Sequence, residues 1–175
     1  MKFYKKKCKI ILSGAKWCEV SLSGEEGEFM ANLIGEYNHV IDAKGRLIVP
    51  SFLREQLGEV CYVSKGLDGC LFLYPAEEWI EFMSQVKAQS VYDPNARKLQ
   101  RYFLAGSTEC TFDKQGRILI SNVLRLFADL KKDVVLVGAG DRAEIWDRDK
   151  WEADISFDDI EDIALEVERR KMNGI

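Results

Sequence analysis

Two short elements with one shared pattern hold the side chains best suited to binding chemistry. Both follow the pattern Asp-x-x-Gly-Arg, the first at 42–46 and the second at 113–117. An arginine in a tight turn is always charged, and its planar guanidinium can bind a phosphate, or the O6 and N7 atoms of guanine, through two hydrogen bonds. The other role open to each arginine is an ion pair with the aspartate of its own element, which would fix the turn. The residues alone leave both roles open, and the two can coexist.

Further cations flank both elements. Lys44 and Lys114 stand two and three residues before the arginines, and Arg54 and Arg125 follow in the helices that we predict next along the chain. Lysine and arginine side chains at such positions are typical of phosphate binding. We therefore predict a DNA contact made by six cations: Arg46, Lys44, Arg117, Lys114, Arg54 and Arg125. We predict a turn-fixing role for four further residues: Asp42, Gly45, Asp113 and Gly116.

Catalytic and cofactor chemistry has little support in the sequence. His39 is the only histidine and has no Ser, Cys or Asp partner at a recognisable spacing, and no motif for nucleotide binding, zinc hydrolysis or serine hydrolysis is present. The cysteines are scattered without a Cys-x-x-Cys pair, which indicates reduced thiols and neither a disulfide framework nor a metal site. We expect no enzyme activity, no cofactor, no metal and no small-molecule substrate.

The charge balance neither favours nor excludes a nucleic-acid partner. The chain has a net charge of −4, but the excess of acidic residues lies in 152–175, and the segment 1–29 is basic. A local basic patch is enough to meet phosphates. No apolar run has the length of a membrane helix, and the apolar stretch 10–12 is too short for a secretory signal. We therefore expect a cytoplasmic protein with no membrane partner.

A sequence repeat organises the chain. The stretch that begins at Gly35 aligns with the one that begins at Gly106, and both contain the Asp-x-x-Gly-Arg element followed by an aliphatic triplet. With one residue inserted, Trp79 of the first copy aligns with Trp151 of the second. A single hairpin pair is only marginally stable alone. We therefore expect the two copies to complete each other in one interlocked unit.

Hydrophobic periodicity and turn residues predict the same elements in both copies. In the first copy we predict strands at 37–41, 46–49, 60–64 and 71–74, with helices at 50–57 and from 76 onward. In the second copy we predict strands at 109–112, 117–120, 134–137 and 143–146 and a helix at 123–130. Further helices are predicted at 94–103 and 158–171. The resulting division is an N-terminal extension expected to be disordered (1–29), repeat 1 (35–77), a helical linker (78–105), repeat 2 (106–149) and an acidic C-terminal helix (150–175).

These motifs resemble those of the MraZ family of bacterial transcription regulators. The resemblance rests on 35–50 and 66–79 in the first copy and on 106–120 in the second, and it covers about 30–152. It implies a mainly β α+β fold in which two tandem swapped-hairpin (SpoVT/AbrB-like) repeats form one pseudo-symmetric barrel-like unit with flanking helices. Segment 1–29 has no family counterpart. Ser121 and Asn122 replace the family's proline-containing helix entry, and both residues are good helix caps.

The resemblance also implies a function. The family signature Asp-x-x-x-Arg falls on Asp42 and Arg46 and again on Asp113 and Arg117, and it implies DNA contact by the first arginine above all. We expect a sequence-specific, nucleoid-associated regulator that binds double-stranded DNA at short repeated operator elements as a ring-shaped homo-oligomer. Its target would be the division and cell-wall gene cluster that includes its own gene. The alternative is an antitoxin-like protein-interaction module with the same fold, favoured by the acidic tail.

Overall fold

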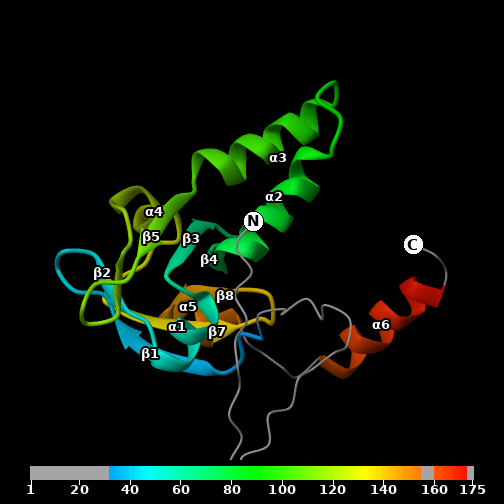
Figure 1. Ribbon diagram of the computed structural model, residues 1–175. Helices are drawn as coiled ribbons and strands as arrows, with labels where there is room; N and C mark the ends of the chain where they lie inside the picture. The colour runs from blue at the N-terminus through cyan, green and yellow to red at the C-terminus, as the bar shows by residue number, and fades with distance from the viewer. Residues whose placement is uncertain (1–31, 155–159, 173–175) are drawn as a thin grey trace, which may run out of the picture.

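The fold is built around one open antiparallel sheet and a separate two-stranded ribbon. The computed structural model describes residues 32–154 and 160–172 (Figure 1). The sheet has the strand order β1-β7-β8-β4-β3-β5, and the ribbon consists of β2 and β6. The strands of the first copy are β1 (Glu36–Val40), β2 (Arg46–Ile48), β3 (Val60–Lys65) and β4 (Leu71–Pro75). Those of the second copy are β5 (Thr108–Thr111), β6 (Arg117–Leu119), β7 (Asp133–Gly138) and β8 (Ala143–Asp147).

Strand pairing between the copies is what joins the sheet. Four pairings connect a strand of the first copy to one of the second: β1 with β7, β3 with β5, β4 with β8, and β2 with β6. Within a copy, the hairpins β3–β4 and β7–β8 pair. Because the backbone groups of each copy find their partners in the other, the two copies are interlocked.

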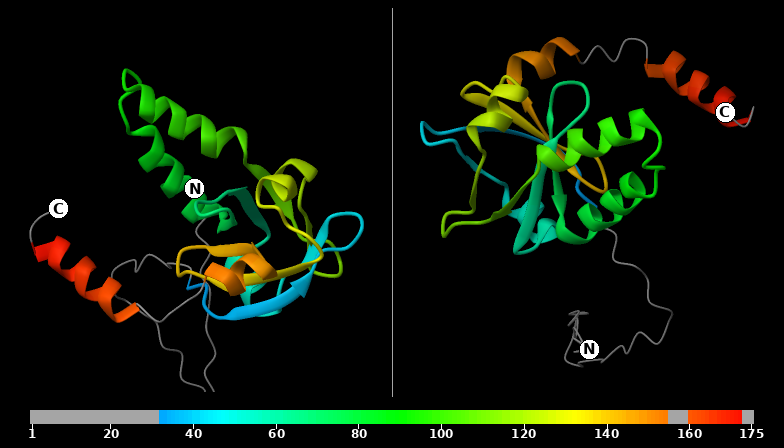
Figure 2. Two further views of the ribbon diagram at one scale, coloured as in Figure 1. Left: turned by 180° about the vertical axis from the view of Figure 1, so that it is seen from behind. Right: turned by 90° about the horizontal axis from the view of Figure 1, so that it is seen from above.

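The described part of the chain also contains six helices. Short helices follow the ribbon strands, α1 (Ser51–Leu57) in the first copy and α4 (Asn122–Phe127) in the second. Next come α2 (Ala76–Lys87) and α3 (Pro94–Ala105), which lie side by side and project from the sheet (Figures 1 and 2). The C-terminal helices are α5 (Arg148–Asp154) and α6 (Ile160–Met172).

Capping residues explain where two of these helices begin. The Asp93 carboxylate accepts a hydrogen bond from the backbone N–H of Asn95 at 2.8 Å, and Pro94 occupies the first helical position of α3. The Ser121 hydroxyl accepts one from the backbone N–H of Leu124 and caps α4. Ser121 therefore begins the helix without a proline, as the sequence predicted.

The strand β4 separates two hydrophobic cores. All five of its residues are buried, since successive side chains point to opposite faces of the sheet. Leu71 and Leu73 pack into the larger core with aliphatic residues of both copies. Phe72 and Tyr74 pack on the other face, in an aromatic core with residues of α2, α3 and β8. The aromatic core holds the α2–α3 hairpin against the sheet, on the side away from the β1–β2 turn (Figure 2).

The structure confirms a mainly sheet α+β fold and corrects the prediction in three places. The expected barrel is not formed, because the six-stranded sheet stays open. The helix predicted at 123–130 ends at Phe127, because Asp129 adopts a left-handed backbone conformation (φ 53°). The C-terminal helical segment predicted at 150–175 begins two residues earlier, with α5 at Arg148, where the Asp147 carboxylate accepts a hydrogen bond from the N–H of Asp149. The predicted disorder of 1–29 lies outside the described residues.

The ribbon gives a test of the packing. Leu47 is fully buried, whereas the adjacent Ile48 is 45% exposed. We predict that Leu47→Ala lowers the free energy of unfolding by about 2–5 kcal/mol, because it leaves a cavity between the copies. Ile48→Ala is the control and should cost about 1 kcal/mol or less. Urea unfolding at one fixed protein concentration measures both, and equal losses would contradict the assigned orientation of the ribbon.

Candidate nucleic-acid interface

The β2–β6 ribbon presents two arginines on one face. Arg46 lies opposite Leu119, Leu47 opposite Ile118, and Ile48 opposite Arg117. Leu47 and Ile118 point into the core, where they are 0% and 1% exposed. Strand alternation therefore places the other four residues together on the outer face: Arg46, Ile48, Arg117 and Leu119. The two arginines occupy diagonal positions on this face, for which Cα atoms are about 7–8 Å apart.

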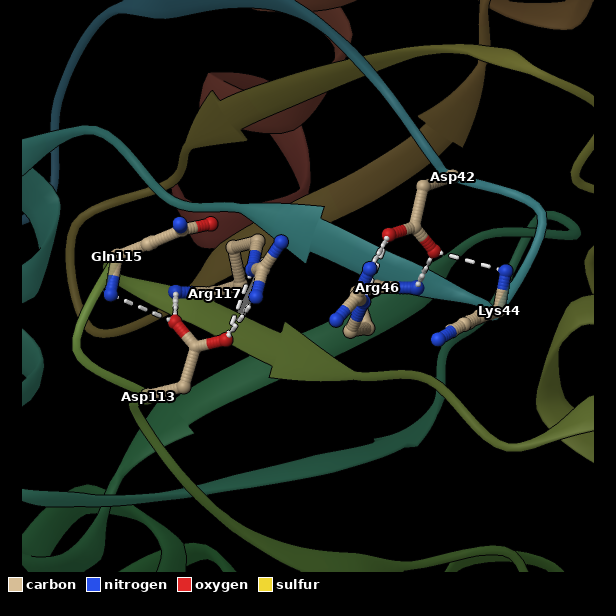
Figure 3. A network of polar contacts seen from close by, with 6 residues as sticks. All are labelled: Asp42, Lys44, Arg46, Asp113, Gln115 and Arg117. Carbon is tan, nitrogen blue, oxygen red and sulfur yellow. Dashed lines mark hydrogen bonds and ion pairs between the residues drawn. The ribbon is translucent and has the colours of Figure 1, made fainter.

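The turn before β2 is fixed by the Asp42 carboxylate (Figure 3). One of its oxygens, Oδ1, accepts hydrogen bonds from the backbone N–H of Lys44 at 2.8 Å and of Arg46 at 3.0 Å. The other oxygen, Oδ2, accepts from Nε of Arg46 at 2.6 Å and forms an ion pair with its Nη2 at 2.6 Å. Gly45 takes a positive φ of 81°, which favours glycine. The turn and the orientation of the arginine thus depend on one carboxylate.

The turn before β6 repeats this geometry. Oδ1 of Asp113 accepts from the backbone N–H of Gln115 at 2.8 Å and of Arg117 at 3.0 Å, and Oδ2 contacts Nε and Nη2 of Arg117 at 2.8 and 2.7 Å. Gly116 also has a positive φ, of 72°. The Asp–Arg ion pair, one of the two roles that the residues alone left open, is formed in both turns (Figure 3).

The two aspartates are strongly held in their charged form. The side-chain hydrogen bond from Arg46 is the main cause that lowers the pKa of Asp42 to about 2, and backbone N–H groups contribute. Arg117 does the same for Asp113, whose pKa is also lowered to about 2. Because each arginine is offset by its aspartate, the net positive charge of the turns comes from the lysines. Lys44 and Lys114 are exposed, and neither forms an ion pair within the part of the chain that the structure describes.

Arg54 and Arg125 lie beside the turns and not on the outer face of the ribbon. Both are half-buried, on α1 and α4. Arg54 donates through Nε to the backbone carbonyl of Val49 at 3.0 Å. Nη2 of Arg125 donates to Oδ1 of Asn122 at 3.4 Å. The structure thus places all six predicted cations in the ribbon turns or beside them, but in two different environments.

Two outward aliphatic residues were missed by sequence reasoning. Ile48 is 45% exposed and Leu119 is 60% exposed, and each lies opposite an arginine in the ribbon. The sequence showed both inside aliphatic triplets, which are typical of fully buried strands. Strict alternation from the buried Leu47 would have placed Ile48 outside.

Groups that could do catalysis are not assembled in the described residues. Burial lowers the pKa of His39 and raises the pKa of the Cys61 and Cys70 thiols to about 12, so neither thiol is a ready nucleophile. Among these residues no three His, Cys, Asp or Glu side chains gather as metal ligands. No helix in the described ranges is long and apolar enough to cross a membrane.

The lowered pKa values give a pH prediction. An unperturbed aspartate is half protonated at its ordinary pKa of 3.8, but Asp42 and Asp113 should remain ionised there. Because the pKa is lowered on folding, the stabilisation is complete above the ordinary pKa and is lost as the pH falls towards 2. Carboxyl ¹³C NMR near pH 3.8 measures the protonation. Arg46→Ala should raise the protonated fraction of Asp42 and leave that of Asp113 unchanged. Half-protonated carboxyls in the unsubstituted chain would contradict the geometry.

Comparison with known proteins places the chain in a family. The family model described as "MraZ protein, putative antitoxin-like" matches twice in tandem, at 33–102 and at 103–171. A relative from Lachnoclostridium phytofermentans, named transcriptional regulator MraZ, is 54% identical over 131 residues, which cover 75% of this chain and 92% of the relative.

Two further relatives carry the same name. The protein from Heliobacterium modesticaldum is 54% identical over 118 residues (67% of this chain, 82% of the relative), and that from Thermoanaerobacter sp. strain X514 is 47% identical over 133 residues (73% and 93%). The tandem match spans both copies of the repeat and includes nearly all of α6. The tandem family match and the identity to these relatives show that the chain belongs to the MraZ family.

Proposed function

We propose that this chain is a DNA-binding transcriptional regulator that contacts double-stranded DNA through the outer face and turns of the β2–β6 ribbon. The names of its relatives support regulation of transcription and point away from an enzyme. The single observation that carries the choice of surface is the pair of buttressed arginines on one face of a two-stranded ribbon. The major groove of DNA is wide enough to admit such a ribbon.

Arg46 and Arg117 are assigned to base readout. Asp42 engages Nε and Nη2 of Arg46, which leaves Nη1 and the second N–H of Nη2 for guanine or a phosphate. A guanidinium already held by a carboxylate loses little conformational freedom on binding, which favours affinity. Arg46 is placed first because it belongs to the first signature of the family. Its side chain is also 33% exposed, against 20% for Arg117.

The remaining residues of the surface have supporting roles. Lys44 and Lys114 project from the turns and would bind phosphates, with Arg54 and Arg125 adding positive charge beside them. Ile48 and Leu119 occupy the other two positions of the exposed face, each opposite an arginine, where an apolar side chain can contact the methyl group of thymine. A face on which arginines alternate with aliphatic residues suits sequence-specific contact.

One protomer offers few such contacts, so affinity requires several protomers on repeated sites. We therefore propose that this chain forms the ring-shaped homo-oligomer of the family and binds short repeated operator elements. We also propose that it is associated with the nucleoid and regulates the division and cell-wall gene cluster. The reciprocal strand pairing supports two swapped-hairpin repeats, divided as 35–77 and 106–149 with a helical linker between them.

A second candidate function is a protein-interaction module. The family model carries the word antitoxin-like. α6 has acidic residues in its first turn and basic residues in its last turn, and exposes Ile160, Ile163 and Val167. Selection of bound DNA from a random double-stranded pool, run beside capture of protein partners from lysate, separates the two functions. Enrichment of a DNA sequence supports the regulator, and a specific captured partner without enriched DNA supports the module.

We predict that Arg46→Ala removes binding to the selected DNA while leaving the oligomer intact. One bidentate base contact accounts for about 5- to 150-fold in affinity, and the loss multiplies over the protomers bound. A gel-shift titration at one stated salt concentration measures binding, and light scattering measures the oligomer. Arg170→Ala is the matched control, since Arg170 also pairs with an acidic residue four positions earlier but lies on α6. Unchanged binding by Arg46→Ala would refute the assignment.

A further inference from the structure

We infer that Arg54 and Arg125 are positioning residues, each of which holds the DNA-contacting turn of the opposite copy. The role in DNA contact rests on the proposed function, whereas the contacts of the two arginines are present in the DNA-free protein. The sequence groups each arginine with the turn that precedes it in the same copy. The structure places Arg54, from the first copy, against the turn of the second, and places Arg125, from the second copy, against the turn of the first.

The contact between Arg54 and Gly116 is too close for a Cβ atom unless the guanidinium moves. A Cβ atom on Gly116 would lie 2.6 Å from Cζ, 2.7 Å from Nε and 2.9 Å from Nη1 of Arg54. The guanidinium therefore covers the glycine closely. Gly116 is buried, whereas the two residues before it, Lys114 and Gln115, are exposed. The guanidinium of Arg54 therefore covers the glycine and not the rest of the turn.

A similar but looser contact is present in the other copy. A Cβ atom on Gly45 would lie 3.1 Å from Nε and 3.2 Å from Cζ of Arg125. Gly45 is also buried, and the adjacent Lys44 is exposed. Two independent copies of one sequence motif thus build the same crossed contact, which a chance packing of two surface arginines does not explain.

Backbone hydrogen bonds complete the crossed arrangement. The carbonyl of Gly116 accepts from the N–H of Val49 at 3.0 Å, and the carbonyl of Val49 accepts from Nε of Arg54. At the equivalent position of the other turn, the carbonyl of Gly45 accepts a hydrogen bond from the N–H of Ile120 at 2.9 Å. Each glycine is therefore fixed on one side by the backbone of the opposite copy and covered on the other by its arginine.

The consequence concerns the residues next to the glycines. Gly45 is followed at once by Arg46, and Gly116 by Arg117. If Arg125 sets the position of Gly45, the second copy fixes the arginine with which the first copy reads bases. A guanidinium held against a glycine is also poorly placed to leave for a phosphate. We therefore separate the six cations into four that contact DNA and two that hold the contacting turns.

Hydrogen exchange of the DNA-free full chain tests the crossed contact directly. In Arg125→Ala, amides of the first turn (42–46) should exchange faster by on the order of tenfold, with the second turn (113–117) unchanged. Arg54→Ala should give the reverse pattern. Faster exchange only in the turn of the same copy, or in neither turn, would overturn the inference whether or not the chain binds DNA.

DNA binding then separates positioning from direct contact. A positioning role predicts that Arg125→Ala weakens binding to the selected DNA without changing the slope of log affinity against log salt. It also predicts that Arg125→Lys has the same weakened affinity, because an ammonium cannot cover the glycine as a planar guanidinium does. A direct phosphate contact predicts a slope reduced by about 0.9 and restored by lysine. That second result would overturn the inference.

A double-mutant cycle identifies the partner. The cycle is measured at low salt, where phosphate contacts leave a residual affinity to the Arg46→Ala chain. Arg125→Ala should be strongly non-additive with Arg46→Ala, because both act through the first turn, and additive with Arg117→Ala. Additivity with both would contradict the crossed assignment. If the unsubstituted chain selects no DNA, the proposed function fails, while the exchange experiment still decides the crossed contact.

Discussion

Reciprocal strand pairing between the two copies is the constraint on which the rest of the structure depends. A two-stranded ribbon needs a partner for every strand, and here β2 finds its partner in β6 of the other copy. The pairing buries Leu47 against Ile118 and, by alternation, directs Arg46 and Arg117 outward on the same face. A slip of one residue would reverse both results. The core and the charged face are therefore products of one register.

The sequence predicted much of this arrangement. The repeat, the alternating strands and the Asp-x-x-Gly-Arg turns identified most elements to within a few residues, because each depends on local chemistry such as a glycine at positive φ or a capping serine. The open sheet and the crossed contacts could not be predicted, since they depend on which copy pairs with which. Sequence proximity groups Arg54 with the first turn (42–46), but its guanidinium covers Gly116 in the second turn.

Local geometry also reconciles an acidic protein with a nucleic-acid partner. The net charge is −4, yet six cations lie in the two ribbon turns or beside them. The aspartate of each turn forms an ion pair with the arginine of the same turn. Each aspartate orients a guanidinium and offsets its charge, so the lysines of the turns supply the excess positive charge. Recognition here would depend on the placement of a few side chains and on repetition over protomers, with overall charge contributing little.

The central claim, that the outer face of the ribbon meets DNA, is tested most directly by site-specific photocrosslinking to the selected DNA. A photoreactive phenylalanine derivative at Leu119, which is 60% exposed, probes the ribbon, and the same group at Ile80, 67% exposed on α2, probes a distant surface of similar exposure. The account predicts crosslinks to DNA from position 119 and none from position 80. Crosslinks from position 80 alone, or equal yields from both, would contradict it.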